Sequence, residues 1–205
     1  MDSPKKRVRA TTARVTTSKR SDYPGVVRII SGAWRGRRLQ VPNMAGLRPT
    51  PDRVRETVFN WLRPWLSGAH CIDLFAGTGV LCLEALSRGA ARVVMVEKRP
   101  AIAANLRHSV AALAAENAEV VEADAIEHLA GPVEQFDIVF VDPPFQSDLI
   151  ARSSQMIEQH GWLVSGGFAY IEAPREMATL PIPDSWELIR SQQAGNVGYH
   201  LARRR

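Results

Sequence analysis

From residue 70 onward, short strand-like apolar runs alternate with segments of helical periodicity, and no other feature of the sequence constrains the fold as much. Strands are expected at 71–75, 92–97, 120–122, 136–141 and 162–171, with helices at 80–88, 100–115, 126–129 and 147–160 between them. Strands that alternate with helices form βαβ units around a parallel sheet. Two last strands, 186–191 and 197–202, flank a turn with Gly195 and Asn196 and predict an antiparallel hairpin that closes the sheet.

The first 50 residues have a different character. Residues 1–24 mix Lys, Arg, Ser and Thr with almost no large apolar side chains, so we expect a disordered basic tail. Residues 25–50 are expected to form a β-hairpin extension around the glycine-bearing turn 32–36. A helix at 51–66 then opens the main domain, 51–205, with Thr50 as its predicted N-cap and Pro51 as its first residue.

Charge is distributed unevenly along the chain. Residues 1–55 contain 14 Lys and Arg and 3 Asp and Glu, a balance of +11. The remaining residues contain 12 and 18, a balance of −6, and the two parts together give the net charge of +5. A basic arm on a more acidic body favours phosphate backbones as partners. The candidate nucleic-acid contacts in this arm are Trp34, Arg35, Arg37, Arg38 and Arg48.

The sequence disfavours several classes of protein. Its longest apolar runs have the length of strands, well short of the roughly 20 residues that cross a bilayer. No apolar stretch follows the basic N-terminus as in a secretory signal. Cys71 and Cys82 lack metal-ligand spacing and indicate buried free thiols in a reducing compartment. We therefore expect a cytoplasmic protein with no membrane contact and no metal ion. The sequence does not indicate an oligomeric state, and a monomer is the default expectation.

A glycine-bearing loop follows the first strand of the alternating region. It reads Asp73-Leu74-Phe75-Ala76-Gly77-Thr78-Gly79 and leads into a helix. Ligands bind at the carboxyl ends of strands in open α/β sheets, and glycines allow a tight turn and the close approach of a ligand. The candidate cofactor contacts in the loop are Asp73, Phe75, Ala76, Gly77 and Gly79. The loop alone does not separate a dinucleotide from another adenosine cofactor, although Cys82 stands where the dinucleotide fingerprint has a third Gly or Ala.

Acidic residues follow the next two strands. Glu97 is placed to accept hydrogen bonds from both hydroxyls of a ribose, and a surface pairing with Lys98 or Arg99 is the alternative interpretation. Asp124, followed by Ala125, suits two compatible roles, which are capping the short helix and contacting an adenine amino group. A free ribose occurs in more than one adenosine cofactor, so these residues do not identify the ligand.

The segment Asp142-Pro143-Pro144-Phe145 after the strand 136–141 is the most informative. The amino group of a nucleic-acid base is a poor nucleophile because its lone pair is delocalised into the ring. The Asp142 carboxylate and the Pro143 carbonyl can accept its N–H bonds and aim the lone pair at a methyl carbon, so that catalysis depends on positioning and preorganised charge. Phe145 offers a face on which an extruded base stacks. The predicted catalytic residues are Asp142, Pro143 and Phe145.

Taken in order, these segments resemble the motifs of class I S-adenosylmethionine methyltransferases. Two N-terminal stretches, 28–37 and 47–62, are more specific, and with them residues 26–205 resemble the RsmD-type family of bacterial small-subunit rRNA guanine-N2 methyltransferases. The resemblance implies a Rossmann-like fold with a seven-stranded, mostly parallel sheet, an antiparallel last strand and a small N-terminal hairpin extension. It also implies S-adenosylmethionine as cofactor, and ribosomal RNA or the small ribosomal subunit as partner, methylated on N2 of one guanine.

Carried over by position, the resemblance assigns the cofactor loop to Asp73, Gly77 and Gly79, the ribose contact to Glu97 and the adenine-side contact to Asp124. It assigns the target amine and the base-stacking position to Asp142, Pro143 and Phe145.

Three alternatives stay open. A DNA or other RNA base methyltransferase of the adenine N6 type would share the Asp142 motif, although 205 residues leave no visible target-recognition domain. An NAD-dependent oxidoreductase is disfavoured by Cys82 and by the Asp142 motif. A non-catalytic RNA-binding assembly factor is disfavoured because the Asp142 motif is intact.

Overall fold

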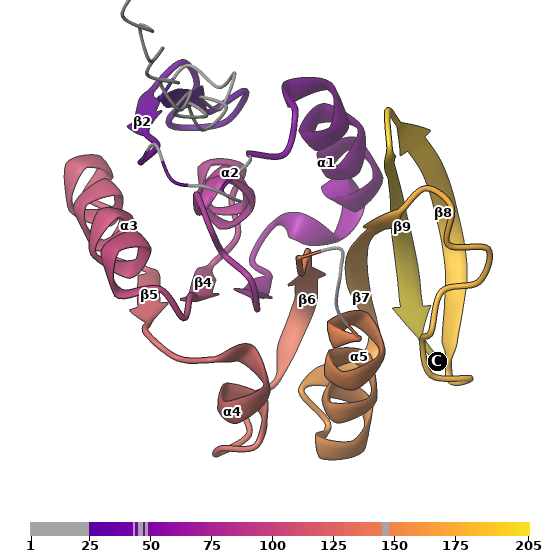
Figure 1. The fold of residues 1–205 in the computed structure, drawn as a ribbon. Coiled ribbons are helices and arrows are strands. Elements are labelled where there is room, and N and C mark those ends of the chain that lie inside the picture. Colours follow the sequence, from indigo (N-terminus) through magenta and orange to yellow (C-terminus); the bar gives the residue numbers. More distant parts are fainter. Residues whose placement is uncertain (1–24, 43, 45–46, 48, 145–147) are drawn as a thin grey trace, which may run out of the picture.

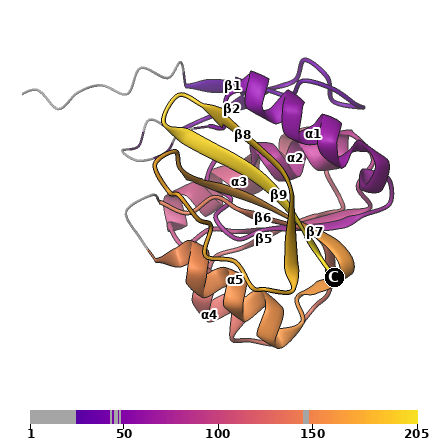
Figure 2. The same ribbon diagram turned by 90° about the vertical axis from the view of Figure 1, so that its right-hand side faces the viewer.

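The computed structural model describes residues 25–42, 44, 47, 49–144 and 148–205, in which helices cover both faces of a seven-stranded sheet (Figures 1 and 2). The strands of this sheet are β3 (His70–Asp73), β4 (Arg92–Val96), β5 (Ala118–Val121), β6 (Phe136–Val141), β7 (Leu163–Pro174), β8 (Trp186–Ala194) and β9 (Val197–Arg204). The helices are α1 (Asp52–Leu66), α2 (Val80–Ser87), α3 (Pro100–Leu113), α4 (Ala125–Leu129) and α5 (Leu149–His160). The tail expected at 1–24 lies outside the described residues.

The strand order is β5-β4-β3-β6-β7-β9-β8. Strand β9 runs antiparallel to both β7 and β8, and the other neighbouring pairs are parallel. This arrangement confirms the predicted mostly parallel sheet with an antiparallel last strand. The direction in which strands are added reverses between β3 and β6, and ligands bind at the carboxyl ends of the strands that flank such a switch point.

Each face of the sheet has its own hydrophobic core. Ile138, Phe140 and Tyr170 belong to the core that α1, α2 and α3 cover, whereas Val139 and Val141 belong to the core under α4 and α5. Side chains of a strand alternate between its two faces, and here both faces are buried. This double burial explains why the run 138–141 of β6 is continuously apolar instead of alternating. The two cysteines are buried and free, as predicted.

The start of α1 differs from the prediction. Pro51, predicted as the first helical residue, is instead the N-cap, and the helix begins at Asp52. Among the described residues, no side chain caps this helix. The predicted capping role of Thr50 is therefore wrong. Its hydroxyl instead donates a 3.2 Å hydrogen bond to Oε1 of Glu172, 122 positions along the chain. A tertiary acceptor of this kind is invisible to local capping rules.

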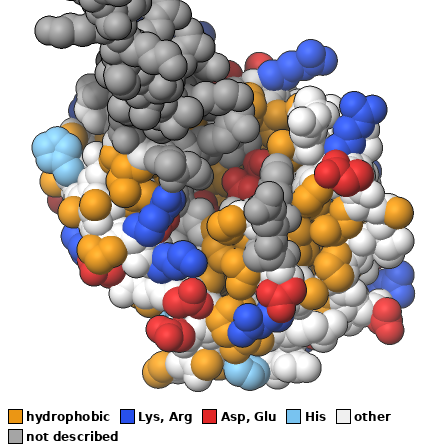
Figure 3. All heavy atoms as spheres, in the orientation of Figure 1, with side chains coloured by type: hydrophobic (Ala, Val, Ile, Leu, Met, Phe, Trp, Pro, Cys, Tyr) orange, Lys and Arg blue, Asp and Glu red, His pale blue; other side chains and the backbone are white. Residues whose placement is uncertain are grey.

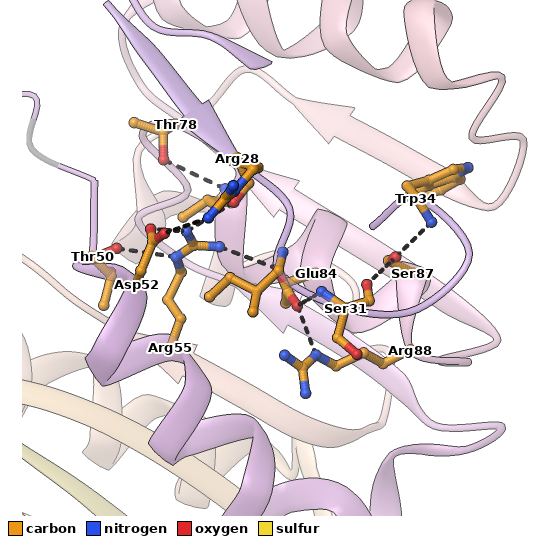
Figure 4. A network of polar contacts seen from close by, with 12 residues as sticks. Arg28, Ser31, Trp34, Thr50, Asp52, Arg55, Thr78, Glu84, Ser87 and Arg88 are labelled. Carbon is orange, nitrogen blue, oxygen red and sulfur yellow. Dashed lines mark hydrogen bonds and ion pairs between the residues drawn. The ribbon is translucent and has the colours of Figure 1, made fainter. Parts of the chain in front are cut away.

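The N-terminal hairpin consists of β1 (Val26–Arg28) and β2 (Arg38–Gln40), and a buried ion network fastens it to the helices (Figure 4). The guanidinium of Arg55 in α1 is fully buried and donates to the Arg28 carbonyl at 2.9 Å and to the Thr50 carbonyl at 3.1 Å. It also pairs with Oδ1 of Asp52 at 2.6 Å and with Oε2 of Glu84 at 3.1 Å. Arg55 therefore joins the hairpin, α1 and α2.

Glu84 in α2 completes this network. Its carboxylate accepts the backbone N–H groups of Ile30 at 2.8 Å and Ser31 at 3.0 Å, and it pairs with Nε of Arg88 at 2.7 Å. Apolar side chains of the hairpin belong to the same hydrophobic core as α1 and α2. The described part of the extension thus shares the core of the main domain. Among the described residues, no helix has the length and apolarity needed to span a membrane.

Candidate active site

The glycine-bearing loop runs from the end of β3 toward the end of β4. Oδ1 of Asp73 accepts the backbone N–H of Phe75 at 3.0 Å, which turns the chain sharply after the strand. The N–H of Ala76 then donates to the Val96 carbonyl at 2.9 Å, and the N–H of Gly77 donates to Oε2 of Glu97 at 3.1 Å. These bonds hold the loop across the carboxyl ends of two neighbouring strands.

The two glycines of the loop meet different demands. Both have a positive φ, 51° at Gly77 and 73° at Gly79, which favours glycine. A Cβ at Gly79 would lie 2.5 Å from Cδ2 of Leu106 and 3.1 Å from Sδ of Met95. Packing of the loop against α3 and β4 therefore favours glycine at position 79. The sequence alone does not reveal this contact, since it explains Gly79 by a tight turn and the approach of a ligand.

The acidic residues after β4 and β5 also have structural partners. Glu97 is 6% exposed and accepts the backbone N–H and the Nε–H of Arg99 at 2.9 and 3.2 Å, besides the Gly77 N–H. Asp124 is the N-cap of α4 and accepts the N–H of Ile126 at 2.9 Å. The capping role predicted for Asp124 is confirmed, and Ala125 is buried in the core beneath α4. The predicted ribose and adenine contacts of Glu97 and Asp124 stay predictions.

Asp142 lies directly after β6, in the same pocket as the glycine-bearing loop. The pocket is lined by Thr50, Asp73, Phe75, Ala76, Gly77, Thr78, Val80, Leu81 and Asp142. Strand pairing explains this proximity, because Asp73 of β3 pairs with Phe140 of β6, two residues before Asp142. Pro143 is buried beside Asp142, whereas Phe145 lies outside the described residues. Gly79, Glu97 and Asp124 are not among the lining residues.

A larger cavity of about 540 Å³ lies elsewhere, between β8, β9 and the segment that follows β7. None of its described lining residues is a predicted site residue. Its lining mixes apolar side chains such as Met177 and Leu180 with His200 and Asp184. The small pocket at Asp142 is the candidate active site because it, and not the larger cavity, contains the chemistry-bearing motifs.

Negative charges accumulate in the candidate site. Burial raises the pKa of Asp73 to about 7, and the charges of Glu97 and Glu172 add to this effect, against the hydrogen bond from Phe75. Desolvation also holds the pKa of Asp142 well above its usual range, reinforced by Glu172 and Asp73. Acidic side chains are visible near the middle of the face in Figure 3, beside hydrophobic ones. Perturbed carboxyl groups in a pocket are typical of functional sites.

Sequence reasoning missed Glu172 at this site. Glu172 is 5% exposed, lies in β7 and influences the pKa of both Asp73 and Asp142. The signal that singled out Glu97, an acid at the end of a predicted strand, applied equally to Glu172 after the strand expected at 162–171. Glu172 lies outside every motif that the sequence analysis recognises, so the sequence alone assigns it no role.

The described hairpin residues that were predicted to contact nucleic acid divide into two groups by their contacts with the rest of the protein. Arg35 and Arg38 are exposed. Arg37 is exposed but donates to the Ala112 carbonyl at 2.7 Å, and Trp34 packs against the core while its backbone N–H donates to Oγ of Ser87 at 2.9 Å. Trp34 and Arg37 thus help to fix the hairpin. Arg48 lies outside the described residues.

The strand order, the glycine-bearing loop after β3 and the acidic residues at the strand ends together define the class of protein. They are the features of the class I methyltransferase fold, a Rossmann-like sheet that ends in an antiparallel strand. The solved structure of yhhF from Escherichia coli shares this fold with a TM-score of 0.81 and 46% identity, over 88% of this chain and 98% of that chain. The solved structure of TrmN from Thermus thermophilus, at 19% identity and a TM-score of 0.63, shares the fold alone.

Sequence comparison identifies the family. The sequence model of the family described as Conserved hypothetical protein 95 matches residues 27–203. Ribosomal RNA small subunit methyltransferase D of Escherichia coli is 46% identical over 88% of this chain and 91% of its own length. The protein of the same name from Haemophilus influenzae is 40% identical over 86% and 93%. The chain therefore belongs to the ribosomal RNA small subunit methyltransferase D family.

Proposed function

We propose that this protein transfers the methyl group of S-adenosylmethionine to the exocyclic N2 amino group of a guanine in small-subunit ribosomal RNA. The observation that carries this proposal is the shared pocket of Asp142 and the glycine-bearing loop. The names of the similar proteins support ribosomal RNA as substrate. The choice of guanine N2 rests on the resemblance of the Asp142 motif and of the N-terminal stretches to the RsmD-type family.

The charge of the site fits a cationic cofactor. S-adenosylmethionine carries a positive sulfonium and an ammonium group. In the pocket, the charge of Glu172 raises the pKa of both Asp73 and Asp142, and the charge of Asp73 raises that of Asp142. A nearby positive charge favours the ionised form of such carboxyl groups and relieves their mutual repulsion. The pyrophosphate of a dinucleotide would instead add negative charge. Asp73, the backbone at Gly77 and the Glu97 carboxylate are the groups that would hold the cofactor.

Asp142 and Pro143 would act on the base. When bound, the cofactor supplies an electrophilic methyl group. The Asp142 carboxylate accepts one N–H of the target amine and the Pro143 carbonyl accepts the other. Their fixed positions turn the nitrogen lone pair away from the ring, so the rate gain comes from orientation and preorganised charge.

The hairpin would hold the RNA backbone. Arg35 and Arg38 are exposed on an element that the Arg55 network fixes against the main domain. Phosphate contacts of this kind are not specific for sequence, and they make binding strongly dependent on salt. The hairpin would therefore contribute affinity and orientation, and the pocket would select the base.

Transfer of a labelled methyl group tests the proposal. The protein is incubated with labelled S-adenosylmethionine and, in separate reactions, with small subunits that lack the modification, naked small-subunit rRNA and duplex DNA. We expect label on N2 of one guanine in the subunits or the rRNA. Label on DNA alone would favour the adenine N6 alternative, and the absence of cofactor binding would refute the proposal.

A further inference from the structure

A second carboxylate lies beside Asp142, on the neighbouring strand. Val141 of β6 pairs with Ile171 of β7 in parallel register, and the residues that follow them are Asp142 and Glu172. Residues paired in parallel strands point to the same face of the sheet. Glu172 shares its face with Tyr170, whose side chain lies in the core covered by α1 and α2. This register explains the electrostatic influence of Glu172 on Asp142.

Two hydroxyl groups hold the Glu172 carboxylate. The Tyr170 hydroxyl donates to Oε1 at 2.7 Å, and the Thr50 hydroxyl donates to the same oxygen at 3.2 Å. All three side chains are buried, with Tyr170 at 0% and Thr50 at 6% exposure. Two donors on one oxygen fix the orientation of the carboxylate, because each restricts its rotation.

Thr50 connects this carboxylate to the ion network of the hairpin. Its carbonyl accepts the Nε–H of Arg55, its hydroxyl donates to Glu172, and it lines the pocket together with Asp142. The segment before α1 is therefore part of the site, and its position is set by a fully buried arginine (Figure 4).

We propose that Glu172 is a positioning residue of the methyl-transfer site, which holds Asp142 in the orientation and the charge state that the target amine requires. This inference rests on the proposed function and goes beyond it, because the motif that indicated the chemistry ends at Phe145. Glu172 acts through Asp142, and the contact with the amine belongs to Asp142 and Pro143.

The electrostatics of the pair follow from its surroundings. Burial raises the pKa of Glu172, whereas the hydrogen bonds from Tyr170 and Thr50 act in the opposite direction. The charge of Glu172 is the largest influence on Asp142 after desolvation. The other titratable groups that face the pair, directly or through one neighbour, are Asp73, Glu97, Tyr170, Tyr199 and Arg55. Among these groups, the charges of Asp73 and Glu97 favour a bound proton, whereas the Tyr170 hydrogen bond and the positive charge of Arg55 oppose it.

The raised proton affinity of Asp142 suits methyl transfer to an amine, because the product must release a proton. After methyl transfer, the amine nitrogen is positively charged and must lose one of its protons. That N–H bond breaks, its electron pair stays on nitrogen, and the proton passes to the Asp142 carboxylate. A negative charge on Glu172 increases the affinity of Asp142 for this proton, and the two carboxyl groups titrate as a pair.

A titration of Asp142 tests the inference without any substrate. The full-length protein is labelled with carbon-13 at the Asp carboxyl carbons, and the Asp142 signal is assigned by its loss in Asp142→Asn. We expect Glu172→Gln to lower the titration midpoint of Asp142 by about one unit or more, because the neutral amide removes a like charge. The same midpoint in wild type and Glu172→Gln would overturn the proposal.

Kinetics separate positioning from a purely structural role. For Glu172→Gln we expect kcat to fall by about 10- to 100-fold while KM for RNA and the cofactor Kd stay within about threefold, since misplacement of a reacting group costs rate more than binding. Glu187→Gln is the matched control, because Glu187 is an exposed acid of β8 paired with Arg205. It should change neither kcat nor the Asp142 midpoint. An unchanged kcat for Glu172→Gln would contradict the proposal.

Tyr170→Phe gives an independent route should Glu172→Gln fail to fold. Loss of the hydroxyl favours the neutral form of Glu172, so the Asp142 midpoint should move in the same direction by a smaller amount. An unmoved midpoint would again overturn the proposal. Label on a base atom other than guanine N2 would refute the proposed function and leave this inference intact, whereas a guanine-N2 product with an unmoved midpoint would refute this inference alone.

Discussion

Two clusters of buried charge meet at Thr50, and they are balanced in opposite ways. Around Arg55, the guanidinium lies between the carboxylates of Glu84 and Asp52, so each buried charge has a counter-charge. At the strand ends, burial and the charges of Glu172 and Asp73 raise the pKa of Asp142, and burial raises the pKa of Glu172. The first cluster has its counter-charges within the described residues, whereas a bound cation would offset the negative charge of the second.

The difference shows which cluster serves the fold and which serves the chemistry. Removing one partner of a buried ion pair leaves an uncompensated charge, which is a large loss of stability. Carboxyl groups that repel one another in a pocket lower stability, and they persist where function requires them. We therefore expect substitutions in the first cluster to act on folding and substitutions in the second to act on the reaction.

The largest effect is expected from Arg55→Met. This substitution leaves Glu84 paired with Arg88 alone and removes the guanidinium that donates to the Arg28 and Thr50 carbonyls, so it should reduce the free energy of unfolding by about 3–5 kcal/mol, measured by urea denaturation. Arg107→Met is the control, because its partner Glu122 is exposed and such pairs contribute at most about 1 kcal/mol. Equal losses in the two variants would mean that the Arg55 network does not stabilise the fold.

Asp142→Ala tests the second cluster. Turnover should fall by at least about 100- to 1000-fold, the cost typical of removing one preorganised group of an active site. Affinity for S-adenosylmethionine, measured by calorimetry, should stay within a few-fold. Asp148→Ala is the matched control, because Asp148 is an exposed acid just before α5. If Asp142→Ala abolishes cofactor binding, Asp142 belongs to the cofactor site and not to the amine site.

Asp73→Asn should show by how much the ionised Asp73 carboxylate lowers the free energy of unfolding. The folded protein raises the pKa of Asp73 from 3.8 to about 7, so between these values the native state binds more protons than the unfolded state. Unfolding free energy should therefore fall as the pH rises from about 4 to about 7. The amide removes this dependence, and the variant should be more stable than wild type at pH 8 in the absence of cofactor.

Urea denaturation of both proteins across this pH range measures the difference. The gap between wild type and Asp73→Asn should open as the pH rises and reach a plateau above about pH 7. A variant that is less stable at every pH would show that the hydrogen bond from Phe75 to Asp73 outweighs the repulsion.

Much of the fold could be predicted from the sequence because the spacing of apolar residues in strands and helices repeats over a few positions. Alternating apolar runs and helical periods predicted the sheet, and Asp142, directly after an apolar strand, was placed at its carboxyl end. Glu172 lay at a strand end as well, but its role depends on the register between β6 and β7. Pairing register between distant strands is not encoded in either strand alone.

Thr50 and Gly79 show the same limit from two sides. Local rules made Thr50 a helix cap, although a distant acceptor on β7 was available to its hydroxyl. Local rules predicted that Gly79 allows a tight turn and the close approach of a ligand. The side chains of Leu106 and Met95 also lie too close to this position for a Cβ. The wrong cap at Thr50 and the packing contact missed at Gly79 both arose because the deciding neighbour lies far away in the sequence, whereas the approach of a ligand to Gly79 stays a prediction.

The smallest effect is expected at the exposed charges of the hairpin, which differ from both buried clusters. Arg35→Ala and Arg38→Ala should each weaken RNA binding a few-fold and leave the fold and the cofactor affinity unchanged. Each lost phosphate contact should reduce the slope of log K against log salt concentration by roughly 0.7 to 0.9. Arg190→Ala, at an exposed position on β8, is the control and should leave the slope unchanged. Because Arg55 holds the hairpin by backbone carbonyls and not by these side chains, their loss should not disturb the buried network. An unchanged slope in both hairpin variants would place the RNA on another surface.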